Sequence, residues 1–229
     1  MLSVVIPALN AEHRLADALS ALVPAVVSGL VRDVVIADGG SSDATALIAE
    51  AAGAALIKCE RGRGHQLRTG AAAAKGPWLL FLHADTVLEP GWEREARSFM
   101  ELVDSGRRSQ AAAAFRFALD DAGLKPRVLE QLVSWRCRLL AIPYGDQGLL
   151  ISKRHYEATG GFRALPLMED IDFVRRLGRS RLVMLRSKAL TSASRYHRDG
   201  YVLRPMRNLS CLMLYFLNVP ARLISRIYG

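Results

Sequence analysis

Three carboxylates lie within four positions of one another, on Glu169, Asp170 and Asp172. A helix is expected to begin here, and the positive end of a helix dipole favours acidic residues in its first turn. Crowded like charges also raise the pKa of one member, which suits a general base that deprotonates an attacking hydroxyl. The segment is therefore a candidate catalytic base, and an ordinary acidic helix start is the alternative.

Polar residues also follow the expected strands near the sheet edge where ligands bind in parallel α/β folds. Asn10, Asp38 and Asp85 each come shortly after an apolar run. Asp38 can accept a hydrogen bond from a base or a ribose hydroxyl, and Gly39 and Gly40 let the backbone approach a ligand. The alternative is a tight turn whose Asp43 caps the next helix, as Asn10 is expected to cap the first.

His83 and Asp85 form a candidate divalent-cation site directly after the run Trp78–Leu82. A carboxylate with a second ligand two residues away suits Mg²⁺ or Mn²⁺ that carries a diphosphate. Asp85 is the hard-cation ligand of this pair, and His83 and the more distant His197 are softer ones. An aspartate satisfied by loop amides is the alternative.

Two basic clusters are candidates for holding phosphates. Arg63 lies in a Gly-rich loop with Arg68 downstream, and Arg195 and Arg198 flank His197. The loop lacks the Gly-Lys-Ser/Thr ending of a P-loop, and no GxGxxG pattern follows the first strand, which argues against both standard nucleotide motifs. A solvated basic loop is the alternative for the second cluster.

Strands and helices must position these residues, and the sequence predicts them as short apolar runs that alternate with helical patterns. The first half predicts strands at 2–6, 34–37, 54–57 and 78–82 with helices between them, which is typical of a parallel sheet covered on both faces. The second half predicts strands at 111–119, 149–152 and 182–185 and helices at 127–140, from 168, 201–217 and 221–228, with Pro205 and Pro220 interrupting. No linker or repeat divides the 229 residues, so one composite domain is expected.

Net charge divides this domain unevenly. The chain carries +9 overall, yet residues 175–229 hold 12 basic residues and one acidic residue, which leaves −2 on residues 1–174. This asymmetry indicates a phosphate or anionic-surface partner. Nucleic acid is not expected, because the basic segment lacks interleaved aromatic residues for base stacking.

Composition excludes collagen-like, disordered and disulfide-framework classes, since hydrophobic residues make up 51% of the chain and charged residues 23%. Three cysteines without metal or disulfide spacing indicate reduced thiols and hence a cytoplasmic protein. No signal peptide or spanning segment is expected.

The C-terminal segment combines apolar residues at helical spacing with arginines. Its apolar face is predicted to pack on the core or in a homodimer. The alternative is an interfacial helix on an anionic membrane, at the inner membrane face, where it presents a lipid-linked or apolar acceptor. The residues concerned are Leu209, Leu212, Met213, Phe216, Leu217, Leu223, Ile224, Ile227 and Tyr228.

Four motifs occur in the order in which family 2 glycosyltransferases of the GT-A fold carry them. Val4–Glu12 resembles the opening strand and loop of that family, and Asp38–Thr45 resembles its nucleotide loop. Phe81–Thr86 stands in the place of the Asp-x-Asp metal motif, and Glu169-Asp170 resembles the acceptor-base motif. Further segments resemble a short bacterial subgroup associated with radical-SAM enzymes, namely 144–148, 160–162, 165–170 and 191–193.

The resemblance implies a GT-A-type mixed α/β sheet flanked by helices, with a helical C-terminal tail. It implies a donor half at about 1–110, an acceptor half at about 111–200 and a basic amphipathic tail at about 201–229. The implied activity is an inverting transfer from a nucleotide-diphosphate sugar, most often a UDP-sugar, to an unidentified hydroxyl acceptor.

Roles for individual residues follow from the same resemblance. Asp170 is the implied catalytic base, and Asp85 holds Mg²⁺ or Mn²⁺ together with the donor diphosphate. The implied donor-binding residues are Pro7, Asn10, Glu12, Asp38, Arg63, Arg68 and Asp85. The implied acceptor or sugar contacts are Asp146, Gln147 and Glu169, and the implied diphosphate contacts are Arg195 and Arg198.

Two departures from the family pattern motivate an alternative. Gly39 replaces the second Asp of the nucleotide loop, and His83 replaces the first Asp of the metal motif. The alternative is a membrane-associated protein that binds nucleotide sugars and turns them over weakly or not at all. A sugar nucleotidyltransferase is disfavoured, because Ala8–Ala11 replaces the Gly-rich start of that family.

Overall fold

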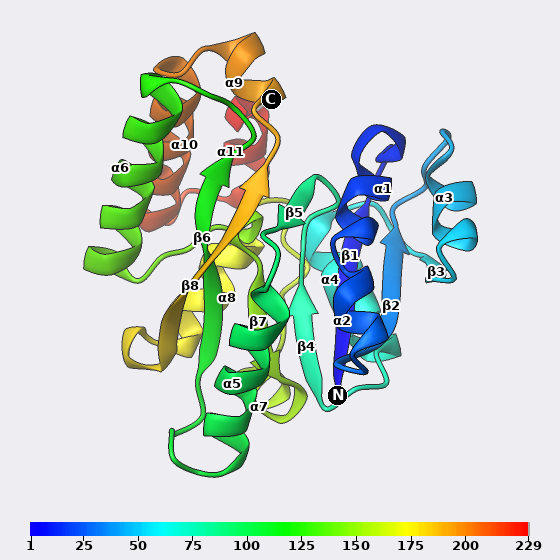
Figure 1. Ribbon diagram of the computed structural model, residues 1–229. Helices are drawn as coiled ribbons and strands as arrows, with labels where there is room; N and C mark the ends of the chain where they lie inside the picture. Colours follow the sequence, from blue (N-terminus) through cyan, green and yellow to red (C-terminus); the bar gives the residue numbers. More distant parts are fainter. Residues whose placement is uncertain (229) are drawn as a thin grey trace.

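A computed structural model describes residues 1–228 and shows one mixed sheet of eight strands with helices against it (Figure 1). The strand order is β3-β2-β1-β4-β7-β6-β8-β5. The strands are β1 Leu2–Ala8, β2 Val31–Asp38, β3 Ala55–Lys58, β4 Trp78–Phe81, β5 Thr86–Leu88, β6 Ala112–Leu119, β7 Leu149–Ser152 and β8 Leu182–Thr191. The helices are α1 Glu12–Ser20, α2 Val23–Val27, α3 Thr45–Ala51, α4 Arg63–Ala73, α5 Trp92–Asp104, α6 Leu124–Leu140, α7 Lys153–Ala158, α8 Glu169–Leu177, α9 Ser194–Asp199, α10 Leu203–Phe216 and α11 Ala221–Tyr228, with single 3₁₀ turns η1 Gly145–Gln147 and η2 Arg179–Arg181.

The first half forms the predicted parallel sheet. β1 pairs with both β2 and β4, and Ala8 lies opposite Asp38 in register. β1 and β4 begin at the predicted residues, and their apolar runs are buried on both faces, as in a sheet covered by helices. β2 begins at Val31, three residues before the predicted start, and the edge strand β3 begins at Ala55, one residue after it. β1 continues through Pro7 to Ala8, so the expected strand end at Pro7 is wrong.

The second half makes the sheet mixed, which confirms the predicted fold class. β7 runs antiparallel to both β4 and β6, whereas β6 and β8 are parallel. β8 extends to Thr191, well beyond the predicted end at Leu185, because its last residues pair with β6 on one side and β5 on the other. At the register shift between these pairings, the Glu95 carboxylate accepts hydrogen bonds from the backbone N–H groups of Arg186 and Ser187.

Two buried clusters lie on opposite faces of the sheet. The first packs α1, α2 and α5 on β1 and β4, with Trp78, Trp92 and Phe115 fully buried in it. The second packs α4 and α8 on the other face, where Phe81, Tyr156, Phe162 and Phe173 form an aromatic group. These layers hold the strand ends, and therefore the loops that follow them, in fixed positions.

The C-terminal tail folds back onto the domain. Cys211, Leu212 and Ile224 are buried against Ile142, Leu167, Met168 and Ile171, which confirms core packing for one side of the tail. Pro220 separates α10 from α11, but Pro205 does not interrupt α10, because the first turn of a helix tolerates proline. None of the helices within residues 1–228 is both long and apolar enough to cross a membrane.

Candidate active site

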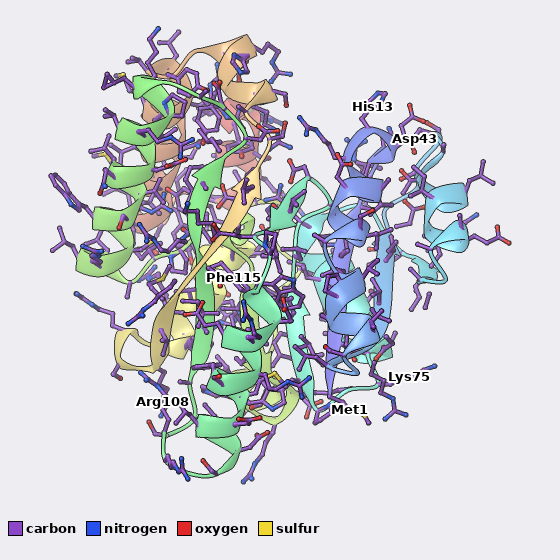
Figure 2. The ribbon with its side chains drawn as sticks, in the orientation of Figure 1. Met1, His13, Asp43, Lys75, Arg108 and Phe115 are labelled. Atoms are coloured by element: carbon purple, nitrogen blue, oxygen red, sulfur yellow. The ribbon has the colours of Figure 1, made fainter. Side chains whose placement is uncertain are left out.

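A cleft of about 880 Å³ opens at the carboxyl ends of β1 and β4. Figure 2 shows His13, which lines this cleft, beyond the end of β1 at that edge of the sheet. The cleft continues into a smaller chamber of about 80 Å³, and the two share Arg63, His83, Asp85 and Arg195. Of the predicted site residues, the lining includes Pro7, Asn10, Arg63, His83, Asp85, Asp146, Asp170, Arg195 and Arg198.

Asp170 is fixed in the wall of the inner chamber. The backbone N–H of Gly145 donates to its Oδ2 at 2.7 Å, and the N–H of Ile171 donates to its Oδ1 at 2.7 Å. Asp170 stands in the first turn of α8. The carboxylate therefore has a fixed orientation while still lining the chamber.

Glu169 points away from that chamber into the interior. Its side chain is fully buried, one oxygen lies 3.5 Å from Nη1 of Arg63, and Oε2 has no hydrogen-bond partner. Burial raises the pKa of Glu169 to about 7, against the attraction of Arg63. Burial rather than crowding is therefore the main perturbation of Glu169. Its side chain contacts Arg63 and lines a small neighbouring cavity of about 20 Å³ together with His83 and Asp170, outside the cleft and the inner chamber.

Asp146 contributes a second carboxylate to the chamber. Its Oδ1 is buried without a partner. Burial raises the pKa of Asp146 to about 6, and the charges of Asp170 and Asp85 act in the same direction. An unpaired buried oxygen that lines a chamber is available to a ligand hydroxyl, since leaving it unpaired costs free energy.

His83 and Asp85 lie together in the lining, as the sequence predicted. Desolvation and the nearby guanidinium groups of Arg63 and Arg195 hold the pKa of His83 well below its ordinary range, so its ring is neutral and can act as a ligand. Within residues 1–228, no three His, Cys, Asp or Glu side chains are grouped to hold a metal ion. The chemistry of the pair thus fits a divalent cation whose other ligands come from donor phosphates and water.

Asp38 and Glu12 hold the loops beside the cleft and do not line it. The Asp38 carboxylate accepts from the backbone N–H of Ser41 at 3.0 Å and from the Ser41 hydroxyl at 2.5 Å. Glu12 accepts from the N–H of Ala44, while Asp43 accepts from the N–H of Glu12. These reciprocal bonds join the starts of α1 and α3.

The two predicted caps differ in outcome. Asn10 does not cap α1, whose first flanking residue is Ala11; its side-chain oxygen instead accepts from the N–H of Ser42. Asp43 accepts from the N–H of Thr45 in the first turn of α3, although the flanking residue of that helix is Ala44.

The structure explains why glycine is suited to position 39. Gln66 is buried under the loop, and its Nε2 donates to the carbonyls of Ala8 at 2.7 Å and Ala37 at 3.0 Å. A Cβ at Gly39 would lie 3.1 Å from that same Nε2. The side chain that ties the ends of β1 and β2 together therefore occupies the space that an aspartate would need.

Three other predicted residues lie outside the cleft lining. Arg68 is exposed on α4, and Nε2 of His197 lies 3.2 Å from Oδ2 of Asp121. Gln147 is buried, where its Nε2 donates to the carbonyl of Phe115 and its Oε1 accepts from Arg136. Gln147 thereby fixes η1, which carries Gly145 and Asp146, without facing the chamber.

The chamber also contains residues that were not predicted as site residues, and the C-terminal helices supply several of them. Arg204 is 4% exposed, and its guanidinium lies over the ring of Tyr228 with 4.5 Å between guanidinium carbon and ring centroid. Oδ1 of Asn208 is buried without a partner. The only sequence signal was the excess of arginine in this segment, since the inward turn of α10 depends on tertiary packing.

Comparison with known proteins identifies a family whose model matches this sequence and solved structures that share its fold. A model described as glycosyl transferase family 2 matches residues 3–157. Glucosyl-3-phosphoglycerate synthase of Mycobacterium tuberculosis is 33% identical over 95 residues, which cover 38% of this chain and 29% of the relative. The same enzyme of Mycolicibacterium smegmatis is 33% identical over 94 residues, or 37% and 31% of the two chains. The aligned segment thus spans under a third of these relatives.

Solved structures align over more of the chain. The M. tuberculosis glucosyl-3-phosphoglycerate synthase in complex with Mg²⁺ and uridine diphosphate has a TM-score of 0.66 at 19% identity and covers 96% of this chain and 80% of its own. S. aureus TarS has a TM-score of 0.63 at 15% identity, with coverage of 99% and 69%. At these identities the similarity shows a shared fold.

Proposed function

The chain belongs to glycosyltransferase family 2, and we propose that it transfers a sugar from a nucleotide-diphosphate sugar to the hydroxyl of an acceptor. The observation that carries this proposal is the chamber itself. It brings Asp85 from the end of β4 and Asp170 from the start of α8 into one lining with Arg63 and Arg195. A donor diphosphate needs cations, and an attacking hydroxyl needs a base; this lining offers both.

UDP-glucose is the first donor to test. The mycobacterial synthase is described in complex with Mn²⁺ and UDP-glucose, and that structure shares the fold of this chain. In our proposal Pro7, Asn10 and Arg63 contact the donor. Asp38 and Glu12 act indirectly, since their carboxylates hold the loops around it.

Residues of this chain perform the transfer as follows. Asp170 removes the proton of the acceptor hydroxyl as its oxygen attacks the anomeric carbon, and the bond from that carbon to the diphosphate oxygen breaks on the opposite side. This in-line attack inverts the configuration at the anomeric carbon. Arg195 and Arg198 stabilise the charge that develops on the leaving diphosphate. A divalent cation held by Asp85 and His83 supplies further charge stabilisation when bound.

We propose that the acceptor binds in the inner chamber. The unpaired oxygens of Asp146 and Asn208 are suited to its hydroxyl groups, and Arg63 and Arg195 are suited to an acidic group. The related synthase is described in complex with phosphoglyceric acid, which makes a hydroxy acid bearing a phosphate the first acceptor to test. A lipid-linked acceptor is the second, because α10 lines the same chamber.

The same proposal also covers the location of the protein in the cell and the subgroup to which it belongs. We propose a cytoplasmic enzyme that works at the inner membrane face, and membership of the subgroup associated with radical-SAM enzymes stays a prediction. A non-catalytic nucleotide-sugar-binding protein is the competing proposal, motivated by Gly39 and His83. The fixed carboxylate of Asp170 favours turnover, because binding alone does not require a base in the chamber.

Release of UDP tests the proposal without knowledge of the acceptor, because a water molecule can attack the donor in place of the acceptor hydroxyl. We expect slow hydrolysis of UDP-glucose that requires Mn²⁺ or Mg²⁺ and is stopped by EDTA. Proton NMR of the first sugar released should show the β anomer from the α-linked donor. Retention of the α anomer would contradict the inverting mechanism, and donor binding without hydrolysis or transfer to any acceptor would support the non-catalytic alternative.

A further inference from the structure

Helix α6 exposes a continuous line of apolar side chains to solvent along its whole length. Trp135 is 59% exposed and Leu139 is 68% exposed, whereas Leu129, Val133 and Cys137 on the other side are buried. The exposed residues recur every three or four positions, as one face of a helix requires. They are Leu124, Val128, Leu132, Trp135 and Leu139.

Helix α10 exposes a second such line. Leu209 is 56% exposed and Met213 is 58% exposed, while Cys211 and Leu212 face the core. Met206, Phe216 and Leu217 continue this line. The ten side chains exposed on α6 and α10 are called the apolar face below.

The two helices run in the same direction (Figure 1). Near their first residues, the hydroxyl of Tyr201 donates to Asp121. Near their last residues, Arg179 donates to the carbonyl of Leu139, and the guanidinium of Arg175 lies 4.8 Å from the ring centroid of Phe216. The two helices are therefore joined directly near their first residues, and near their last residues each contacts the segment 175–179.

Cations border the apolar face. Lys125 and Arg138 are exposed on α6, Arg175 and Arg179 lie where α6 and α10 end, and Arg222 and Arg226 are exposed on α11. Within the described residues of α6, α10 and α11, the single acidic side chain is Glu130, which pairs with Arg127 and accepts from the N–H of Leu119. An apolar surface bordered by arginine and lysine is complementary to an anionic lipid headgroup layer.

We propose that the apolar face of α6 and α10 docks this protein on an anionic lipid bilayer, with its side chains in the headgroup region. A second copy of the chain fits this surface less well. A two-fold contact would place the face on itself and bring its bordering cations together without acids to offset them. Because the inner side of α10 lines the chamber through Arg204 and Asn208, docking brings the chamber close to the lipid surface.

The tryptophans provide a direct reporter. Of the three in the chain, Trp78 and Trp92 are each 1% exposed, and Trp135 lies on the apolar face. The full chain is mixed with vesicles of phosphatidylcholine, with or without phosphatidylglycerol, and tested by co-sedimentation and fluorescence. We expect binding to the mixed vesicles only, a blue shift of emission, and quenching by brominated lipid chains. Added salt should weaken binding.

Two variants and a matched control locate the contact. Leu132→Ser and Met213→Ser should each weaken vesicle binding by about tenfold, because each removes a side chain that would be buried in the lipid. Leu47→Ser changes a leucine on α3 that is 69% exposed, more than Leu132 or Met213, and should leave binding unchanged. UDP affinity should be the same in all three variants, so loss of docking is distinguishable from loss of the proposed function.

Three results would overturn the proposal. One is absence of binding to the anionic vesicles. Another is binding that leaves the Trp135 emission unchanged. The third is sedimentation velocity that shows a stable dimer in which Trp135 is already protected from acrylamide before lipid is added, since the face would then be covered by a second copy.

Discussion

The backbone N–H of Gly145 donates to Oδ2 of Asp170 across 25 positions of sequence, at 2.7 Å. This bond ties η1, which carries Asp146, to the first turn of α8, which carries the proposed base. A Cβ built on Gly145 would lie 2.6 Å from Nε2 of His83 and 3.4 Å from Oδ2 of Asp170. The base and the proposed cation ligand therefore both face the space that the absent side chain of Gly145 leaves open.

Gly145→Ala should disturb both neighbours. The φ angle of Gly145 is not positive, so the clash with His83 decides the outcome. We expect a loss of about 1–3 kcal/mol in the free energy of unfolding, typical of overpacking, and slower UDP release. Urea unfolding and the release assay measure the two effects. The double variant His83→Ala/Gly145→Ala should regain stability; equal stability of the single variant and the parent would contradict this account.

Asp170→Asn should remove the base and keep the shape of the site. We expect UDP release and transfer to fall by about 10²-fold or more, with UDP affinity unchanged. The matched control is Asp17→Asn, which alters an exposed aspartate of α1 outside the cleft lining. Retention of parental turnover by Asp170→Asn would show that another group accepts the proton.

Glu169 should make stability depend on pH. Its pKa is raised from 4.5 to about 7 by burial, so the protonated side chain is the form that the fold favours. Its stabilising contribution is complete below pH 4.5 and is lost as the pH rises through 7. Melting temperatures of the parent and of Glu169→Gln, measured from pH 5 to pH 8, should therefore diverge, with the parent losing more. Parallel curves for the two proteins would contradict the raised pKa.

Gln66→Leu should loosen the ends of β1 and β2. The substitution leaves the carbonyls of Ala8 and Ala37 without their buried donor. The Ala8 carbonyl keeps its bond from the N–H of Gly39. We expect a loss of about 1–3 kcal/mol in the free energy of unfolding, the cost of one unpaired buried polar group, and weaker UDP binding. Gln131→Leu changes an exposed glutamine of α6 and serves as control. The Gln66 account is wrong if both variants unfold at the same urea concentration.

The existence and order of the strands in the first half were predictable from the sequence, because apolar runs that are buried on both faces leave little choice of structure, although several strand bounds were wrong. That pattern placed Asp38 and Asp85 at one edge of the sheet. Helix α5 was not predicted, although Trp92, Ala96, Phe99 and Met100 recur at helical spacing and are buried. The three-residue strand β5 carries too short a pattern to be recognised.

The roles of individual site residues could not be predicted, because they depend on tertiary contacts and not on the local sequence pattern. Glu169 and Asp170 are adjacent in sequence, yet the helix turns one into the core and the other toward the chamber. Arg204 and Asn208 reach the chamber only because Cys211, Leu212 and Ile224 pack on residues far away in sequence. The apolar line on α6 was visible as helical spacing, but only the structure shows that it faces away from the core.

Calorimetric titration of the full chain with UDP in the presence of Mn²⁺ tests the central claim most directly, because every role assigned to the cleft requires a nucleotide diphosphate to bind there. We predict one UDP per chain, with affinity reduced about tenfold or more in Asp85→Ala, which loses a carboxylate ligand of the cation. No heat of binding with UDP or any other nucleoside diphosphate, or equal UDP affinity in the parent and in Asp85→Ala, would contradict the account.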